Sequence, residues 1–573
     1  MSIASRSLQK NLTVGVIGSG ISGLSFTYFL SQLRPDLNFI VFEKQKEVGG
    51  YIHSETKTYG KDANSSLKKS VILEKGPRTL RGSSDGTLLI LDTLLKLGQK
   101  EKIYAVHSKS PGNKKYLLSY EKNSNDEALT EVPNSVETLF KFLFSSLTKY
   151  SIINIFLEMF RKKKKDFSKD ESIEAFFKRR FDKYLNENIA SAMIHGIYAG
   201  DTSKLSFQTI MPKLAELEKT DRSILLGLLK QNYKAFTTKK LEKSGKEECQ
   251  IELSKNLKDY SKYISSPSIP FINLKKFLKN YPIISFKETG ISILTKVLYE
   301  NLKKNPKVKF LFEQDIESIS KNENGKLSLK TLQKVYELDH IRSTINSHSL
   351  ASLISTSLLA KDLQKLNYSD ILLVNLFIPK NLLYTEGFGY LVPKSSILKH
   401  NYLLGCIFDS SIEKHSFRLF ENNRLLVNLI NYPKIKQEEI NSLTYSDFSK
   451  KKPADLGYTK LTLMYGGIYN KEVLSQSYNQ LFKKVNKILE DQFNIDLNVY
   501  KDENGFILEK TVIENCIPQY EVGYNDLYEN VMKNLQSEFE GKLSIGGMSF
   551  NKAKSIGVPD CFMDSFESSI ELK

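Results

Sequence analysis

The feature that most constrains the fold is a glycine-rich turn near the start of the 573-residue chain. The stretch VGVIGSGISGLS contains a GxGxxG motif, and an apolar run at 12–17 that predicts a strand leads directly into it. The next residues, 22–32, predict a helix, and a second predicted strand at 38–42 ends in Glu43. This order and spacing indicate a βαβ unit that binds a dinucleotide.

The turn supplies what a dinucleotide needs. Gly18 permits the tight turn, Gly20 lets the backbone approach a pyrophosphate, and Gly23 allows the helix to pack closely on the strand. The helix N-terminus adds unpaired amides and the positive end of a dipole. Glu43 is the expected acceptor for ribose hydroxyls, and its charge disfavours NADP. A glycine turn without a ligand is the alternative. The candidate residues are Gly18, Ser19, Gly20, Ile21, Ser22, Gly23, Glu43 and Lys44.

The charge balance favours anionic partners. Lysine and arginine total 83 against 65 acidic residues, a formal net charge of +18. Such an excess suits nucleic acid, an anionic membrane surface or an acidic small molecule. No nucleic-acid-binding motif is recognisable, so we expect no nucleic acid partner. For most of the lysines, a solvated surface is the simpler explanation.

Cysteine and histidine patterns predict no metal site. The four cysteines contain no CxxC pair, which argues against a zinc site and a disulfide framework. None of the seven histidines stands in an HxH or HExxH arrangement. Metal catalysis is therefore not expected.

Two later regions stand out. Residues 118–230 look predominantly helical and include a stretch rich in phenylalanine and isoleucine that ends in the basic run RKKKK at 161–165. This stretch is either a buried pair of core helices or an interfacial surface that meets anionic lipid. No run of 18 apolar residues predicts a spanning helix. Residues 239–270 are polar and weakly periodic, which predicts an inserted loop.

A second glycine pair separates FAD from NAD. In EKQKEVGGYIHS, Gly49 and Gly50 follow Glu43 closely, and the chain then continues to EKGPRT. Both features resemble the flavin amine-oxidase superfamily, in which the GPR turn runs beside the flavin. The resemblance implies FAD, with the reduced flavin stabilised by a guanidinium. A surface turn with solvated arginines is the alternative. The residues implied are Gly50, Gly76, Pro77, Arg78 and Thr79.

Seven further motifs, in order, resemble the protoporphyrinogen oxidase family of the fungal and animal mitochondrial type. The resemblance implies FAD-dependent, six-electron oxidation of protoporphyrinogen IX to protoporphyrin IX, with oxygen as acceptor and hydrogen peroxide as product. Another flavin oxidase, of amines or carotenoids, and a non-catalytic FAD-stabilised scaffold remain as alternatives. The motifs are IHGIYAGDTSKLS, RSILLGLL, GFGYLVP, LGCIFDS, LMYGG, NCIPQY and GVPDC.

The resemblance also assigns residues. Phe388, Leu391 and Met464 would line an apolar substrate cavity, although core packing explains such residues equally well. The family's propionate-binding arginine corresponds to Lys115, with Lys114 as a rival and a solvated lysine as the alternative. No catalytic base stands out. Further FAD contacts would be Ile316, Ile556, Gly557 and Val558.

The expected fold is α/β. A discontinuous Rossmann-like FAD-binding domain would comprise 10–106, 276–355 and 510–573. A mixed-sheet substrate domain would fill 356–509, beside the helical membrane-associating region. The resemblance implies a peripheral place on the mitochondrial inner membrane, facing the intermembrane space, with a homodimer and ferrochelatase docking as further partners.

Overall fold

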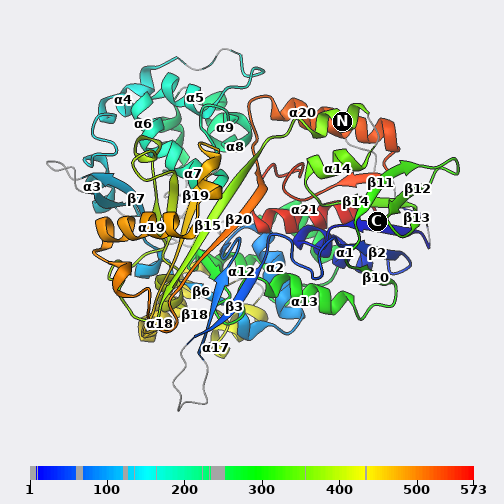
Figure 1. Cartoon of the computed structure of the whole chain (residues 1–573), viewed down its shortest axis with the longest axis horizontal. Helices are drawn as coiled ribbons and strands as arrows, with labels where there is room; N and C mark the ends of the chain where they lie inside the picture. Colours follow the sequence, from blue (N-terminus) through cyan, green and yellow to red (C-terminus); the bar gives the residue numbers. More distant parts are fainter. Residues whose placement is uncertain are drawn as a thin grey trace.

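The structure of the chain is a computed structural model. Helices and sheets from distant parts of the sequence interleave in it, and a helical lobe lies apart from the five-stranded sheet (Figure 1). The structure describes residues 8–9, 11–59, 69–120, 127–134, 136–162, 164, 166–221, 223–231, 233, 252–354, 357–432, 435–466 and 468–573.

A five-stranded parallel sheet forms the base of the molecule, in the order β10-β2-β1-β14-β21. Its strands come from the two ends and the middle of the chain, as predicted for a discontinuous unit. The predicted βαβ opening is confirmed, with α1 at Ile21–Leu33 between two of the strands. The strands are β1 (Thr13–Ile17), β2 (Asn38–Phe42), β10 (Val308–Leu311), β14 (His340–Ser343) and β21 (Leu543–Ile545).

Each face of this sheet has its own apolar core. Alternate side chains of β1 and β2 pack under α1, α2 (Asp85–Lys96), α13 (Ile293–Leu302) and α21 (Val558–Glu571). The other face lies against α14 (Ser347–Leu353), α15 (Leu358–Leu363) and α20 (Tyr524–Phe539). Figure 1 shows α20 and α14 on one side and α1 and α13 on the other. Burial on both faces explains why β1 and β2 are largely apolar.

A seven-stranded mixed sheet, in the order β20-β15-β19-β17-β16-β7-β8, is the second large element. Only β16 and β7 pair in parallel. One face packs on α19 (Tyr478–Phe493). The strands are β7 (Lys115–Tyr120), β8 (Glu127–Glu131), β15 (Tyr368–Ile378), β16 (Gly389–Leu391), β17 (Leu403–Ile407), β19 (Thr459–Gly466) and β20 (Ile507–Pro518).

This sheet draws on more of the chain than the range 356–509. Strands β7 and β8 join it from the region predicted to be helical, and β20 runs across the boundary placed at residue 510. Strand pairing over long sequence separations depends on tertiary contacts, so local patterns could not place these boundaries.

Three smaller sheets complete the strand content of the described residues. A four-stranded sheet has the order β18-β6-β9-β5, a three-stranded antiparallel sheet packs near β2, and a hairpin joins β3 to β4. Their strands are β3 (Ser54–Tyr59), β4 (Lys69–Glu74), β5 (Leu80–Arg81), β6 (Tyr104–Val106), β9 (Ile283–Ser285), β11 (Ile316–Lys321), β12 (Leu327–Thr331), β13 (Val335–Leu338) and β18 (Ser416–Arg418).

The helical lobe gathers at the upper left of Figure 1. Its interior contains a buried ion pair between Arg180 and Glu158, and Glu158 also accepts the amide of Ile224 at 3.0 Å. Among the described residues, no helix is both long and apolar enough to cross a membrane. The elements are α3 (Val136–Leu143), α4 (Ile152–Leu157), α5 (Ile173–Arg180), α6 (Lys183–Leu185), the π-helical turn Asn186–Ala190, α7 (Ser191–Tyr198), α8 (Phe207–Ile210) and α9 (Pro212–Thr220).

The prediction of an inserted loop at 239–270 is wrong for the second part of that range. Residues Lys255–Tyr263 form α11, whose Leu257 and Tyr260 are fully buried in the core beneath the parallel sheet. Tyr260 donates a hydrogen bond to Asp92 at 2.6 Å. Two buried positions three apart on a short helix give too weak a periodic signal among so many lysines. Residues 239–251 lie outside the described part of the chain.

Helices from the later part of the chain extend the same core. α12 (Phe271–Leu278) packs on α18 (Gln437–Lys450), and Asn273 donates to the carbonyl of Leu429 in α17 (Asn423–Asn431) at 3.0 Å. α16 (Asp409–His415) follows β17 and brings its first residue beside β19.

Candidate functional site

The GxGxxG turn is built as a phosphate cradle. Gly18 has a φ of +96°, which favours glycine, and a Cβ on Gly23 would lie 2.0 Å from the Gly18 carbonyl oxygen. Gly20 is the N-cap of α1, where no described side chain caps the helix and no acid occupies the first turn. The amides at this helix end are therefore available to an anion.

Glu43 lies at the end of β2, beside the turn. Its carboxylate accepts hydrogen bonds from the Ser19 amide at 2.8 Å and the Gln45 amide at 2.9 Å. The Gln314 amide donates to the Glu43 carbonyl at 2.9 Å, which brings the start of β11 close. Nearby, Lys44 pairs with Asp315 at 3.2 Å. The structure thus brings Glu43, Lys44 and the neighbourhood of Ile316 together, as a nucleoside site would require.

The second glycine pair continues the cradle toward the GPR turn. Gly20 and Gly49 form a parallel bridge, and Gly50 has a φ of +58°. A Cβ on Gly76 would lie 2.1 Å from the Tyr51 carbonyl oxygen, so the GPR turn rests directly on the chain after the pair. Pro77 and Thr79 are only partly buried there. Glycines at 49, 50 and 76 are therefore needed for close backbone approach.

Arg78 does not offer a free guanidinium. It is buried and pairs with Asp409 at 3.0 Å, and Asp409 also accepts from Thr462 Oγ1 at 2.7 Å. Arg78 was predicted to direct a free positive charge at the flavin. Asp409 balances that charge within the protein, so the guanidinium is not an unpaired cation. The pair instead ties the GPR turn to the mixed sheet. Asp409 belongs to the LGCIFDS motif, and the motif alone did not predict that this carboxylate pairs with Arg78.

The C-terminal helix closes the cradle. Gly557 is the N-cap of α21, so Ile556 and Val558 flank a helix N-terminus, and Ser565 Oγ donates to the Ser22 carbonyl at 2.9 Å. Gly547, with a φ of +84°, lies where a Cβ would be 3.7 Å from Ser22 Oγ. Nothing in the sequence indicated that Gly547 would lie beside Ser22.

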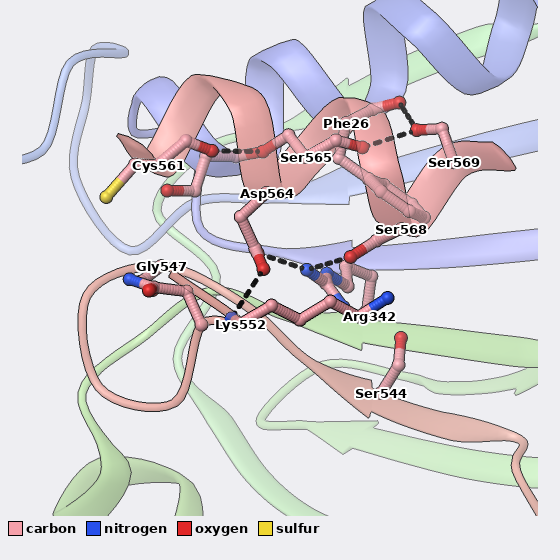
Figure 2. Close-up of polar contacts among 12 residues, drawn as sticks. Phe26, Arg342, Ser544, Gly547, Lys552, Cys561, Asp564, Ser565, Ser568 and Ser569 are labelled. Atoms are coloured by element: carbon pink, nitrogen blue, oxygen red, sulfur yellow. Dashed lines mark hydrogen bonds and ion pairs between the residues drawn. The ribbon is translucent and has the colours of Figure 1, made fainter. Parts of the chain in front are cut away.

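A buried ion pair holds α21 in place (Figure 2). Arg342, from β14, donates to Asp564 at 2.9 Å and to Ser568 Oγ at 2.9 Å. Asp564 also accepts the Lys552 amide at 3.2 Å. The helix, the strand and the loop after Gly547 are therefore fixed as one unit.

These features fit a dinucleotide. The helix end suits a pyrophosphate, the carboxylate at the end of β2 suits ribose hydroxyls, and a Cβ on Gly20 would fill the space between Gly49 and Gly50. The GPR turn and the start of α21 then mark the far end of the cradle. Among the described residues, no group of histidine, cysteine or acidic side chains could hold a metal ion.

Three of the four predicted substrate residues, Lys115, Leu391 and Met464, lie on the mixed sheet. Leu391 pairs with Gly405, Gly405 with Met464, and Gly389 with Lys115, so they lie on adjoining strands. Phe388, just before β16, packs against Val106 and Ile283. Phe388, Leu391 and Met464 are only partly buried, which leaves apolar surface available.

Lys115 and Lys114 have different surroundings. Lys114 pairs with Glu131 at 3.6 Å, whereas no described carboxylate pairs with Lys115. Partial burial and the charge of Arg81 lower the pKa of Lys115. The geometry therefore favours Lys115 over Lys114 as the cation available to a ligand.

His195 has two hydrogen-bond partners. Its Nδ1 lies 2.7 Å from the Val392 carbonyl oxygen and its Nε2 lies 2.7 Å from the Tyr469 hydroxyl. A carbonyl can only accept, so Nδ1 carries the proton and Nε2 accepts from Tyr469. Burial lowers the pKa of His195 to about 4. It is therefore neutral near pH 7 and holds α7 to the GFGYLVP segment.

Comparisons with known proteins show the family of this chain. A family model described as flavin-containing amine oxidoreductase matches residues 21–382. Protoporphyrinogen oxidase from Saccharomyces cerevisiae is 33% identical over 99% of this chain and 98% of its own length. The protein of that name from Schizosaccharomyces pombe is 26% identical over 98% of both chains.

Solved structures show the same fold. A putative protoporphyrinogen oxidase from Exiguobacterium sp. 255-15 superposes with a TM-score of 0.66 at 17% identity, covering 99% of this chain and 100% of that one. A putrescine oxidase variant gives 0.55 at 11% identity, with 99% of each chain covered. FAD is accordingly the cofactor that the cradle accommodates. The chain belongs to the protoporphyrinogen oxidases within the flavin-containing amine oxidoreductase family.

Proposed function

We propose that this chain oxidises protoporphyrinogen IX to protoporphyrin IX, removing six electrons in three steps, with oxygen as acceptor and hydrogen peroxide as product. The observation that carries the proposal is the joining of two surfaces. The GPR turn ends the dinucleotide cradle, and the pair between Arg78 and Asp409 joins it to the mixed sheet that carries Leu391 and Met464, with Phe388 just before β16. A cofactor in the cradle therefore reaches toward an apolar face.

Bound FAD supplies hydride acceptance. The protein's residues position the substrate and exclude water. Phe388, Leu391 and Met464 offer apolar contact to a flat, flexible tetrapyrrole, and Lys115 offers a charge to a propionate. Removal of a pyrrole proton needs no dedicated base if solvent takes it.

The experiment is an anaerobic titration of the purified holoprotein with protoporphyrinogen IX. We expect bleaching of the flavin absorbance near ~450 nm, then porphyrin fluorescence when oxygen is admitted. Polyamines serve as the comparison substrate. Bleaching by polyamines but not by protoporphyrinogen would assign the chain to amine oxidation, and no bleaching by either would favour a scaffold.

Lys115 can be tested in the same assay. Lys115→Ala should raise KM for protoporphyrinogen about tenfold, because one charge-assisted hydrogen bond is lost, and should leave FAD content unchanged. Lys115→Arg should keep or lower KM. Equal losses of substrate and FAD binding in Lys115→Ala would move the propionate site elsewhere.

We propose further that the helical lobe rests on a membrane surface. Large apolar side chains are unusually exposed there, with Ile153 at 73% and Phe160 at 72%. Exposed apolar groups of this size mark interaction sites. The exposed large apolar side chains described in the lobe are Leu139, Phe140, Phe144, Tyr150, Ile153, Phe156, Leu157, Phe160, Met193 and Ile197, and those described after α9 are Leu226, Leu228, Leu229 and Tyr233.

The basic run at 161–165 offers anionic lipid fewer free cations than its composition suggests. Arg161 donates to the carbonyls of Arg179 and Phe181, and Lys164 pairs with Glu171 at 3.5 Å, whereas Lys162 is exposed. Two of its cations are therefore occupied inside the lobe. Lys163 and Lys165 lie outside the described residues.

Vesicle flotation tests the membrane proposal. Replacing Phe144, Ile153 and Phe160 together with serine should weaken binding to anionic vesicles by about 100-fold or more, because each apolar side chain contributes roughly 1.5–3 kcal/mol when buried. The matched control places serine at Leu332 and Val335, which are also exposed but lie on the three-stranded sheet. Equal effects of both variants would contradict a membrane-facing lobe.

The proposed location is the mitochondrial inner membrane, with peripheral attachment on the intermembrane-space side. A homodimer and docking to ferrochelatase complete the proposal. Protease protection in intact and swollen mitochondria would test the orientation, and co-sedimentation with purified ferrochelatase would test the partner.

A further inference from the structure

Arg81 lies directly after the GPR turn, on β5. It is opposite Ile283 of β9, and Ile283 is opposite Val106 of β6. Residues directly opposite on antiparallel strands project from the same face. Ile283 and Val106 pack against Phe388, so Arg81 lies on the face of this small sheet that meets Phe388.

Lys115 lies on the other side of Phe388. The Phe388 amide donates to the Lys114 carbonyl at 2.7 Å, and the next residue, Gly389, pairs with Lys115. Desolvation lowers the pKa of Lys115, and the positive charge of Arg81 lowers it further. Arg81 also acts on Tyr198 at the end of α7, where burial raises the pKa to about 12 and Arg81 opposes the rise. Arg81 is thus within electrostatic reach of both β7 and α7.

The two cations differ from their neighbours in having no anion. Described carboxylates pair with Lys114, Arg78 and Lys394, but none pairs with Arg81 or Lys115. The charge of Asp560 also raises the pKa of Tyr198. This carboxylate accepts a hydrogen bond from Ser555 Oγ at 2.5 Å, and no described ion pair joins it to Arg81 or Lys115.

Both side chains are exposed, so each is accessible to a ligand, and a bound dianion would balance their like charges.

We propose that Arg81 is a second carboxylate-binding residue of the substrate site, acting with Lys115 across Phe388 to select a dicarboxylate. This inference rests on the proposed function. The two propionates of protoporphyrinogen project from neighbouring pyrrole rings, so two separated cations hold one edge of the macrocycle and fix its orientation. Arginine adds a planar fork that can bind a carboxylate through two hydrogen bonds, whereas Lys115 supplies a point charge.

The test is equilibrium binding to the FAD-loaded protein, with protoporphyrin IX and its dimethyl ester as probes, followed by fluorescence. Arg81→Ala should weaken binding of the diacid about tenfold or more and change binding of the ester less than about twofold. The affinity of Arg81→Lys for the diacid should lie between those of the wild type and Arg81→Ala. Arg418→Ala is the matched control, because Arg418 lies on β18 at the opposite edge of the same sheet and is paired with Glu288 at 2.9 Å.

Two further readouts separate binding from structure. KM for protoporphyrinogen should rise in Arg81→Ala while kcat stays within about twofold. The free protein should unfold at an unchanged or higher temperature, because a like-charge repulsion is removed. Equal weakening of diacid and ester, or no weakening of either, would overturn the assignment. Wild-type protein that binds the diacid through Arg81 but does not oxidise protoporphyrinogen would contradict the proposed function and leave the Arg81 site standing.

Discussion

Gly20 and Gly23 belong to the same glycine-rich turn, but a side chain would meet different surroundings at each. A Cβ on Gly20 would find its nearest atoms at 3.8 Å and 3.9 Å, in ordinary contact with Gly49 and Gly50. A Cβ on Gly23 would lie 2.0 Å from backbone oxygen. The first glycine keeps space for a ligand, and the second is required by the fold itself.

Substitutions at these two glycines should therefore fail in different ways. Gly20→Val should fold but retain less than about a tenth of the FAD, because the side chain occupies the pyrophosphate space. Gly23→Ala should lose folded protein. Flavin absorbance per protein and circular dichroism separate the two losses. Full yellow colour in Gly20→Val would contradict the cradle.

The pair between Arg78 and Asp409 is the second prediction at this scale. Asp409→Ala should lower the free energy of unfolding by about 3–5 kcal/mol, because it leaves a buried guanidinium without its partner. Urea denaturation measures the change. Asp315→Ala removes the partner of Lys44 in an exposed pair and should cost less than about 1 kcal/mol. Similar costs for both variants would mean that the buried pair does not anchor the turn.

Among the elements, α21 has the most direct bearing on the cofactor. It packs along α1, reaches the Ser22 carbonyl through Ser565 and the Phe26 carbonyl through Ser569, and is held to β14 by Arg342 and Asp564 (Figure 2). The last strand and the last helix thus complete a site that the first thirty residues begin.

Loosening α21 should release FAD. Asp564→Ala should lower the free energy of unfolding by about 3–5 kcal/mol through the unpaired Arg342, and should raise the dissociation constant for FAD. Glu571→Ala, at the exposed pair with Lys552, is the control and should cost less than about 1 kcal/mol. Wild-type FAD affinity in a destabilised Asp564→Ala protein would show that α21 supports the fold without supporting the cofactor site.

At the scale of the whole molecule, buried histidines set a sensitivity to acid. Burial lowers the pKa of His107 and His195 to about 4 and that of His340 to about 3. The unfolded chain binds these protons near pH ~6.5, so it takes them up first as the pH falls. The contribution of these groups to stability is complete above about pH 6.5 and declines between about 6.5 and 4.

Each such histidine should add about 1.4 kcal/mol per pH unit to the loss of stability within that window. Urea unfolding at several pH values between 7.5 and 4.5 would measure the slope. His195→Gln should reduce the slope by one histidine's share, whereas His53→Gln, at a half-exposed side chain, should not change it. An identical slope in His195→Gln would contradict the buried neutral state.

Local patterns predicted the parts of the site that are contiguous in sequence. The cradle around Gly20, the carboxylate of Glu43 and the close turn at Gly76 each follow from backbone requirements within a few residues. The resemblance also proposed Leu391 and Met464 as substrate residues, and both lie on strands of the mixed sheet. They could not give a partner to Arg78 or a place to α11, because those depend on contacts across more than a hundred residues.

The sequence alone predicted a bound dinucleotide and the residues that would hold it, since the steric and hydrogen-bonding demands of a βαβ turn are local. The tertiary structure decided which charges remain available. Ion pairing depends on which strands adjoin, so only the folded chain shows that Asp409 neutralises Arg78 and Glu131 pairs with Lys114, while Arg81 and Lys115 meet no described carboxylate.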